Sequence, residues 1–143
     1  MADPFHILIV EARFYDDIAD ELVQGAQATL NAASATFETV AVPGAYELPA
    51  AVRMAMESGC FDGYIALGCV IRGETTHYET VCNDSSRALQ LLGLQGLCIG
   101  NGILTVENEI QAQVRADPAQ KNKGGEAAQA AMALLDIAGK FAR

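Results

Sequence analysis

Short apolar runs alternate with longer amphipathic stretches along this chain. We expect four strands, at residues 5–10, 36–42, 63–71 and 96–104, because each run is apolar but too short for a buried helix. The runs recur about every thirty residues, which is the length that a strand, a helix and a further parallel strand require. The pattern therefore predicts a succession of such units.

The amphipathic stretches predict five helices. In residues 16–32 the apolar positions recur every four residues, at Ile18, Leu22, Ala26 and Leu30, which places one apolar stripe on a helix. Further helices are expected at about 46–59, 76–92, 107–116 and 124–141, the last two separated by Pro118. Strands that alternate with helices form a parallel sheet covered on both faces. The pattern thus predicts a single doubly wound α/β domain over residues 1–143.

Composition narrows the class of protein. Of the 143 residues, 51% are apolar and 19% are charged, which excludes a disordered chain. No apolar stretch reaches transmembrane length, and residues 1–4 lack the basic start of a secretory signal, so we expect a cytoplasmic protein without a membrane partner. The net charge of −9 and the absence of tryptophan argue against a nucleic-acid partner.

The four cysteines favour buried thiols over a metal site or disulfides. Cys60, Cys69, Cys82 and Cys98 include no C-x-x-C pair, and most of them lie within or beside apolar patterns. Free thiols in a reducing cytoplasm are the better interpretation. Activation of Cys69 as a nucleophile by His77 is an alternative, but one Cys–His pair is weak support for it.

Residues 63–78 contain the strongest candidate for a functional site. The apolar run ends in Cys69, Val70 and Ile71, and a helical pattern opens at residues 75–77. The free N–H groups at the start of a helix bind anions, and His77 lies at this start. Glu74 opposes an anion here unless its side chain points away.

Polar and aromatic residues also follow the other strands. Phe14 follows the first strand, Tyr46 and Glu47 follow the second, and residues 101–107 come at the end of the fourth. Ligands of parallel α/β sheets bind outside the carboxyl ends of the strands, so these residues predict a small-molecule pocket. Each has another explanation by itself, since Phe14 suits a core rim and Glu47 suits the first turn of a helix.

The basic residues are unevenly distributed. All three lysines, Lys121, Lys123 and Lys140, lie in the last quarter of the chain, and Arg115 precedes the first of them closely. This local positive patch is either a solvated loop between two helices or a second set of anion contacts with Arg115 as a bidentate phosphate donor.

The chain resembles the lumazine synthase family over essentially its whole length. The matching stretches are Ala12-Arg13-Phe14, Val42 to Pro49, Leu67 to Tyr78, Gly102 to Asn108, and Asn122-Lys123-Gly124, in family order. The resemblance implies a flavodoxin-like, four-stranded parallel sheet in the order 2-1-3-4. It also implies condensation of 5-amino-6-(D-ribitylamino)uracil with 3,4-dihydroxy-2-butanone 4-phosphate. The products are 6,7-dimethyl-8-ribityllumazine, phosphate and water, and no cofactor is used.

The same resemblance implies roles for individual residues. The pyrimidine and its ribityl chain would be held by Phe14, Ala45, Tyr46, Glu47, Cys69, Val70, Ile71 and Asn101. The phosphate would be held by Glu74, Thr75, Arg115 and Lys123, with Glu74 and Thr75 acting through backbone N–H groups. His77 would transfer protons. Two positions depart from the family, since Asn101 stands where many members have an aromatic residue and Tyr15 replaces an asparagine.

Two rival functions remain from the residues. A non-catalytic protein that holds lumazine or flavin would have no need of Thr75, His77 and Arg115 together. A redox or nucleotide-binding domain would need a glycine-rich phosphate loop after the first strand, and residues 11–16 are not one.

The resemblance further implies pentamers with active sites between subunits, in some relatives assembled into sixty-subunit capsids. We expect a free pentamer here. Residues 1–4 are too few to add a strand to a neighbouring sheet, and the turn at residues 116–121 contains Pro118 and no glycine.

Overall fold

The computed structural model describes residues 3–142. Met1 and Ala2, on which part of the expectation about the N-terminal segment rests, lie outside the described residues, as does Arg143. In the part of the chain that the structure describes, no helix is both long and apolar enough to span a membrane.

Four parallel strands form one sheet in the order β2-β1-β3-β4. They are β1 (His6–Ala12), β2 (Thr36–Val42), β3 (Gly63–Ile71) and β4 (Ile99–Val106). The central strands β1 and β3 are buried almost throughout, which explains their continuous apolar sequences. The strand order and the all-parallel pairing confirm the predicted fold class.

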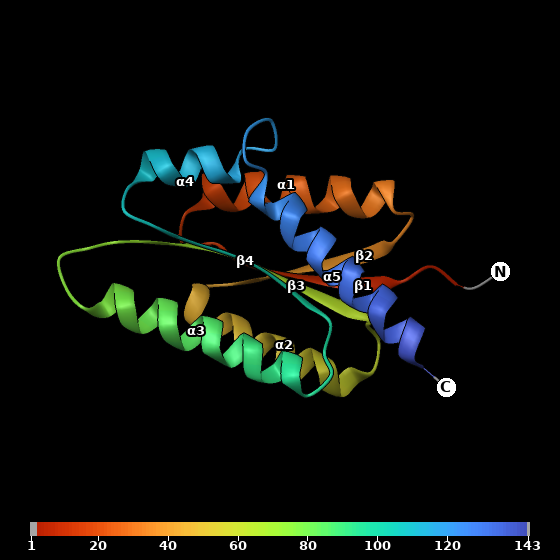
Figure 1. The fold of residues 1–143 in the computed structure, drawn as a ribbon. Helices are drawn as coiled ribbons and strands as arrows, with labels where there is room; N and C mark the ends of the chain where they lie inside the picture. The colour runs from red at the N-terminus through yellow and green to blue at the C-terminus, as the bar shows by residue number, and fades with distance from the viewer. Residues whose placement is uncertain (1–2, 143) are drawn as a thin grey trace.

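Helices cover both faces of this sheet (Figure 1). Helices α1 (Asp16–Ala32), α4 (Glu109–Ala116) and α5 (Lys123–Phe141) pack on one face, and α2 (Leu48–Ser58) and α3 (His77–Leu94) pack on the other. A single 3₁₀ turn, η1 (Ala45–Glu47), joins β2 to α2 within the described residues. The predicted helix near residues 46–59 is therefore a turn followed by α2, in which Pro49 occupies the first turn, where its missing N–H costs no hydrogen bond.

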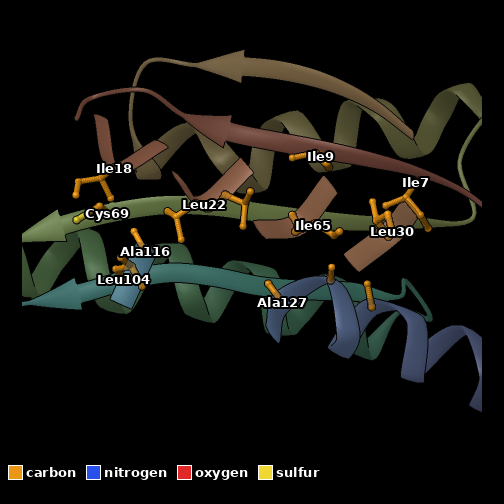
Figure 2. Packing of buried hydrophobic residues seen from close by; sticks show 14 of the residues in the cluster. Ile7, Ile9, Ile18, Leu22, Leu30, Ile65, Cys69, Leu104, Ala116 and Ala127 are labelled. Carbon is orange, nitrogen blue, oxygen red and sulfur yellow. The ribbon is translucent and has the colours of Figure 1, made fainter. Parts of the chain in front are cut away.

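The larger core cluster lies between α1, α4, α5 and the sheet (Figure 2). The predicted stripe on α1 is confirmed, because Ile18, Leu22, Ala26 and Leu30 are all buried in this cluster. At about 25 cal/mol per Å² of apolar surface removed from water, burying each large side chain contributes about 1.5–3 kcal/mol. This packing holds the carboxyl ends of the strands in fixed positions.

Close backbone contacts seat α5 against its neighbours. A Cβ added at Gly100 of β4 would lie 1.9 Å from the carbonyl oxygen of Ala127, and one at Gly124 would lie 2.0 Å from the carbonyl oxygen of Leu22. Only glycine fits at such distances. These two glycines therefore set how closely α5 approaches β4 and α1.

The fourth strand differs from its predicted bounds. It runs from Ile99 to Val106 instead of residues 96–104, because Gly96 has φ 101° and belongs to the turn after α3. Asn101 consequently lies inside β4, opposite Ala66 of β3, and not beyond the carboxyl end of the strand. It is three residues, or about 10 Å, before the position of β4 that pairs with Cys69.

Candidate active site

A cavity of about 480 Å³ opens at the carboxyl ends of β1, β2 and β3. Its volume is in the range of small-molecule sites, and its position is the one where parallel α/β sheets bind ligands. The cavity is lined by Phe14, Tyr15, Pro43, Gly44, Ala45, Tyr46, Glu47, Cys69, Val70, Ile71, Gly73, Thr75, His77, Tyr78 and Val81.

The junction between β1 and α1 presents an exposed aromatic ring to the cavity. Phe14 is 72% exposed, and its ring meets Tyr15 edge-on with the centroids 4.9 Å apart. The neighbouring Arg13 pairs with buried Glu11, with Asp16 at 2.9 Å and with Asp20 at 2.5 Å. Hydrogen bonds to Asp20 and Glu11 raise the pKa of Arg13 above its ordinary value. The junction is therefore rigid, and its exposed ring suits stacking against a planar ligand.

The turn η1 forms a second wall. Glu47 accepts a hydrogen bond from the backbone N–H of Gly44 at 2.9 Å, and Tyr46 donates its hydroxyl to Asp84 of α3 at 2.9 Å. This bond, together with the charge of Asp84, raises the pKa of Tyr46. The wall thus combines a fixed tyrosine with a carboxylate that has further acceptor positions for ligand hydroxyls.

The end of β3 contributes an apolar floor. Cys69 and Val70 are buried and Ile71 is half-buried. Burial raises the pKa of the Cys69 thiol to about 12, so the thiol stays protonated near neutral pH and is a poor nucleophile. The alternative of a Cys69 nucleophile is therefore disfavoured. All four cysteines are free, and besides Cys69 only Cys98 is buried, while Cys82 is half-buried and Cys60 is exposed.

The loop between β3 and α3 supplies polar groups at the cavity's rim. Thr75 and His77 line the cavity, and Thr75 Oγ1 accepts the backbone N–H of His77 at 3.3 Å. Within residues 3–142, the backbone N–H groups of Glu74 and Thr75 donate to no protein acceptor. A Cβ at Gly73 would meet no protein atom within 4 Å, and no left-handed φ requires glycine there. The free space and free donors suit the close approach of an anion.

Three of the predicted site residues do not reach this cavity within one chain. Asn101 lies on β4, as described above. Arg115 is in the last turn of α4, where its Nη1 donates to the carbonyl oxygen of Gln111 at 3.2 Å, and Lys123 pairs with Glu126 at 2.7 Å. Both belong to the helical layer opposite α3. Glu74 is in the loop but does not line the cavity.

Six lining residues were not among the predicted site residues. They are Tyr15, Pro43, Gly44, Gly73, Tyr78 and Val81. Tyr15 adjoins Phe14, and the other five lie beside predicted residues in the loops or in the first turn of α3. The signal that would have found Tyr78 and Val81 is their spacing of three, which puts both on one face of the helix that begins at His77.

The fold and the cavity together define a parallel α/β protein with a small-molecule site at the carboxyl edge of its sheet. A sequence model of the family described as 6,7-dimethyl-8-ribityllumazine synthase matches residues 4–138. The chain belongs to this family.

Relatives of that name are similar over almost their whole length. A 6,7-dimethyl-8-ribityllumazine synthase from Sphingopyxis alaskensis is 57% identical over 136 residues, covering 95% of this chain and 96% of the relative. One from Novosphingobium aromaticivorans is 58% identical over 130 residues, covering 91% and 94% respectively. One from Zymomonas mobilis is 55% identical over 134 residues, covering 94% and 96%.

Proposed function

We propose that this protein condenses 5-amino-6-(D-ribitylamino)uracil with 3,4-dihydroxy-2-butanone 4-phosphate, the penultimate step of riboflavin biosynthesis. The observation that carries the proposal is one cavity that joins an exposed aromatic ring, a carboxylate and a loop with free N–H donors beside a histidine. These groups fit a planar pyrimidine, its ribityl hydroxyls and a phosphate, in that order. Membership of the family supports the same reaction.

The two substrates divide the cavity between them. Phe14 stacks on the pyrimidine, and Ala45, Tyr46 and Glu47 hold the ring edge and the ribityl chain. The buried floor formed by Cys69, Val70 and Ile71 completes the pyrimidine site. The backbone N–H groups of Glu74 and Thr75 bind the phosphate of the butanone. The observed geometry supports this division because the exposed ring and the free N–H groups belong to different strand ends.

The chemistry needs proton transfer more than it needs a protein nucleophile. The amine of the pyrimidine attacks the carbonyl of the butanone, so the protein forms no covalent intermediate. Dehydration of the carbinolamine, loss of phosphate and ring closure each require a proton to move, and His77 at the rim is placed to donate and accept it. Holding two reactive substrates together supplies much of the remaining acceleration.

A neighbouring subunit completes each site in this proposal. Arg115, Lys123 and Asn101 do not line the cavity of their own chain, so they act on the site of an adjacent copy. The edge strand β2 supports association, because most of its residues, including Val40, are exposed in an all-parallel sheet whose strands are normally covered. We infer a homopentamer that works in the cytoplasm, where four free thiols are stable.

We predict a free pentamer in solution, not a sixty-subunit capsid. The turn between α4 and α5 is tightly bonded, since Asp117 accepts the N–H of Ala119 and the side chain of Gln120, each at 2.9 Å, and Pro118 restricts the backbone. Such a turn resists the rearrangement that packing between pentamers would require. Light scattering coupled to size exclusion should give a mass of about five chains, whereas a particle near sixty chains contradicts the prediction.

The Arg115→Ala variant should raise the Michaelis constant for the butanone phosphate much more than that for the pyrimidine. Loss of a charge-assisted phosphate contact is worth about 1.5–3 kcal/mol, or about ten- to a hundredfold. Steady-state kinetics with each substrate varied in turn measures the split. The matched control is Arg53→Ala, since Arg53 pairs only with Glu57 on α2 and lines no part of the cavity. Equal changes for both substrates would remove Arg115 from the phosphate site.

Release of inorganic phosphate tests the proposed reaction. Phosphate should appear at a protein-dependent rate only when both substrates are present, because phosphate leaves after the amine has attacked. A protein that binds 6,7-dimethyl-8-ribityllumazine but releases no phosphate would instead be the non-catalytic binder.

A further inference from the structure

Arg72 begins the loop that carries the proposed phosphate site, and its side chain contacts two other segments. Its Nη1 donates to Oε1 of Glu79, in the first turn of α3, at 2.5 Å. Its Nε lies 3.0 Å from Oε2 of Glu107, directly after β4. Its guanidinium carbon is 4.4 Å from the centroid of the Tyr78 ring, which lines the cavity. The two carboxylates and the ring thus occupy both edges and one face of the guanidinium.

The backbone of Arg72 is fixed as well. Its N–H donates to the carbonyl oxygen of Val106 at 2.9 Å, which extends the pairing of β3 with β4 by one residue. The loop of residues 73–76 therefore starts at an anchored residue whose side chain also grips the helix at the loop's other end. Tying both ends of a short loop reduces the number of conformations open to it.

The geometry points to Arg72 as a positioning residue that clamps the loop of residues 73–76 and the Tyr78 ring in their binding arrangement. The inference rests on the proposed phosphate site. The clamp keeps the N–H groups of Glu74 and Thr75 directed at the phosphate and holds one wall of the cavity. Arg72 acts on the ligand through these groups and makes no contact with it.

Two observations favour a clamp over a direct phosphate ligand. Arg72 already faces two carboxylates, so a phosphate would have to displace one of them against the charge of the other. The hydrogen bond from Arg72 also lowers the pKa of the Glu79 carboxyl, as expected for a pair that stays formed. The planar fork of an arginine can meet two carboxylates and stack on a ring at once, which a lysine cannot do.

Isothermal titration of inorganic phosphate into the assembled protein tests the clamp. We expect Arg72→Lys and Glu107→Gln each to weaken phosphate binding by about tenfold, the size of one charge-assisted hydrogen bond. The Michaelis constant for the pyrimidine should change much less. The matched control is Arg53→Lys, which alters an exposed arginine–glutamate pair on α2 and should leave phosphate binding unchanged. Glu107 is 59% exposed and glutamine has nearly its shape, so this variant should fold normally.

The Glu107→Gln variant separates the two roles by the sign of its effect. If Arg72 were a phosphate ligand, removing Glu107 would free the guanidinium and take away a repelling charge, so phosphate would bind more tightly. Tighter or unchanged binding in this variant, or full retention by Arg72→Lys, overturns the inference. A wild-type protein that neither binds phosphate nor forms product would overturn the proposed function instead.

Discussion

The His77→Ala variant should turn over about a hundredfold more slowly than the wild type while binding both substrates almost normally. A positioned acid–base group contributes about 100- to 10,000-fold, and the lower end is expected here because the substrates are reactive and remain held together. His77 lines the rim of the cavity next to Thr75, so its removal takes away proton transfer without emptying the site. Turnover under saturating concentrations of both substrates measures the effect.

The chain contains its own control for this experiment, because His6 is the other histidine. His6 opens β1 at the opposite end of the sheet, where it stacks on Phe61 and pairs with Glu38 at 2.7 Å. The His6→Ala variant should keep normal turnover even if its stability falls. Equal turnover in the wild type and the His77→Ala variant would exclude His77 from the mechanism.

The Gly100→Ala variant should lose about 3 kcal/mol of unfolding free energy. Its new Cβ would lie 1.9 Å from the carbonyl oxygen of Ala127, and backbone on both sides of this contact cannot yield as a flexible side chain would. Because folded domains are stable by only about 5–15 kcal/mol, such a loss is a large fraction of the total. Urea unfolding followed by circular dichroism, at one protein concentration for all variants, provides the measurement.

Gly139→Ala is the matched control. Gly139 lies in α5, the same helix that Gly100 contacts, but a Cβ there meets no atom within 4 Å and its φ is not left-handed. Replacing glycine by alanine in a helix should stabilise the protein by about 0.5–1 kcal/mol. If both variants changed stability equally, the close approach of α5 to β4 would not explain the need for Gly100.

The sequence was sufficient for the order and type of every strand and helix, for a physical reason. Strands β1 and β3 are covered on both faces, so they appear as unbroken apolar runs, and α1 buries one stripe at helical spacing. The bounds of β4 were less accurate because residues 96–106 are apolar throughout and contain Gly96, Gly100 and Gly102. Pairing with β3, which aligns Val106 with Ile71, determines where the strand ends.

The cavity was predictable where it depends on strand ends, and not where it depends on distant contacts. Phe14, Glu47 and Thr75 follow three different strands, and parallel strands bring their carboxyl ends to one edge. The role of Arg72 was missed because its partner Glu107 follows a different strand, and only the register of β3 with β4 brings the two together. Asn101 was expected at the edge because the end of β4 was misplaced.

The rate at which the purified protein forms lumazine from its two substrates tests the central claim most directly. Absorbance of the 6,7-dimethyl-8-ribityllumazine chromophore should rise far faster with the protein than in buffer, where the reactive substrates condense slowly by themselves. The rise should need both substrates and no added metal or cofactor. A rate equal to that in buffer, from folded protein that still binds the product, would contradict the account.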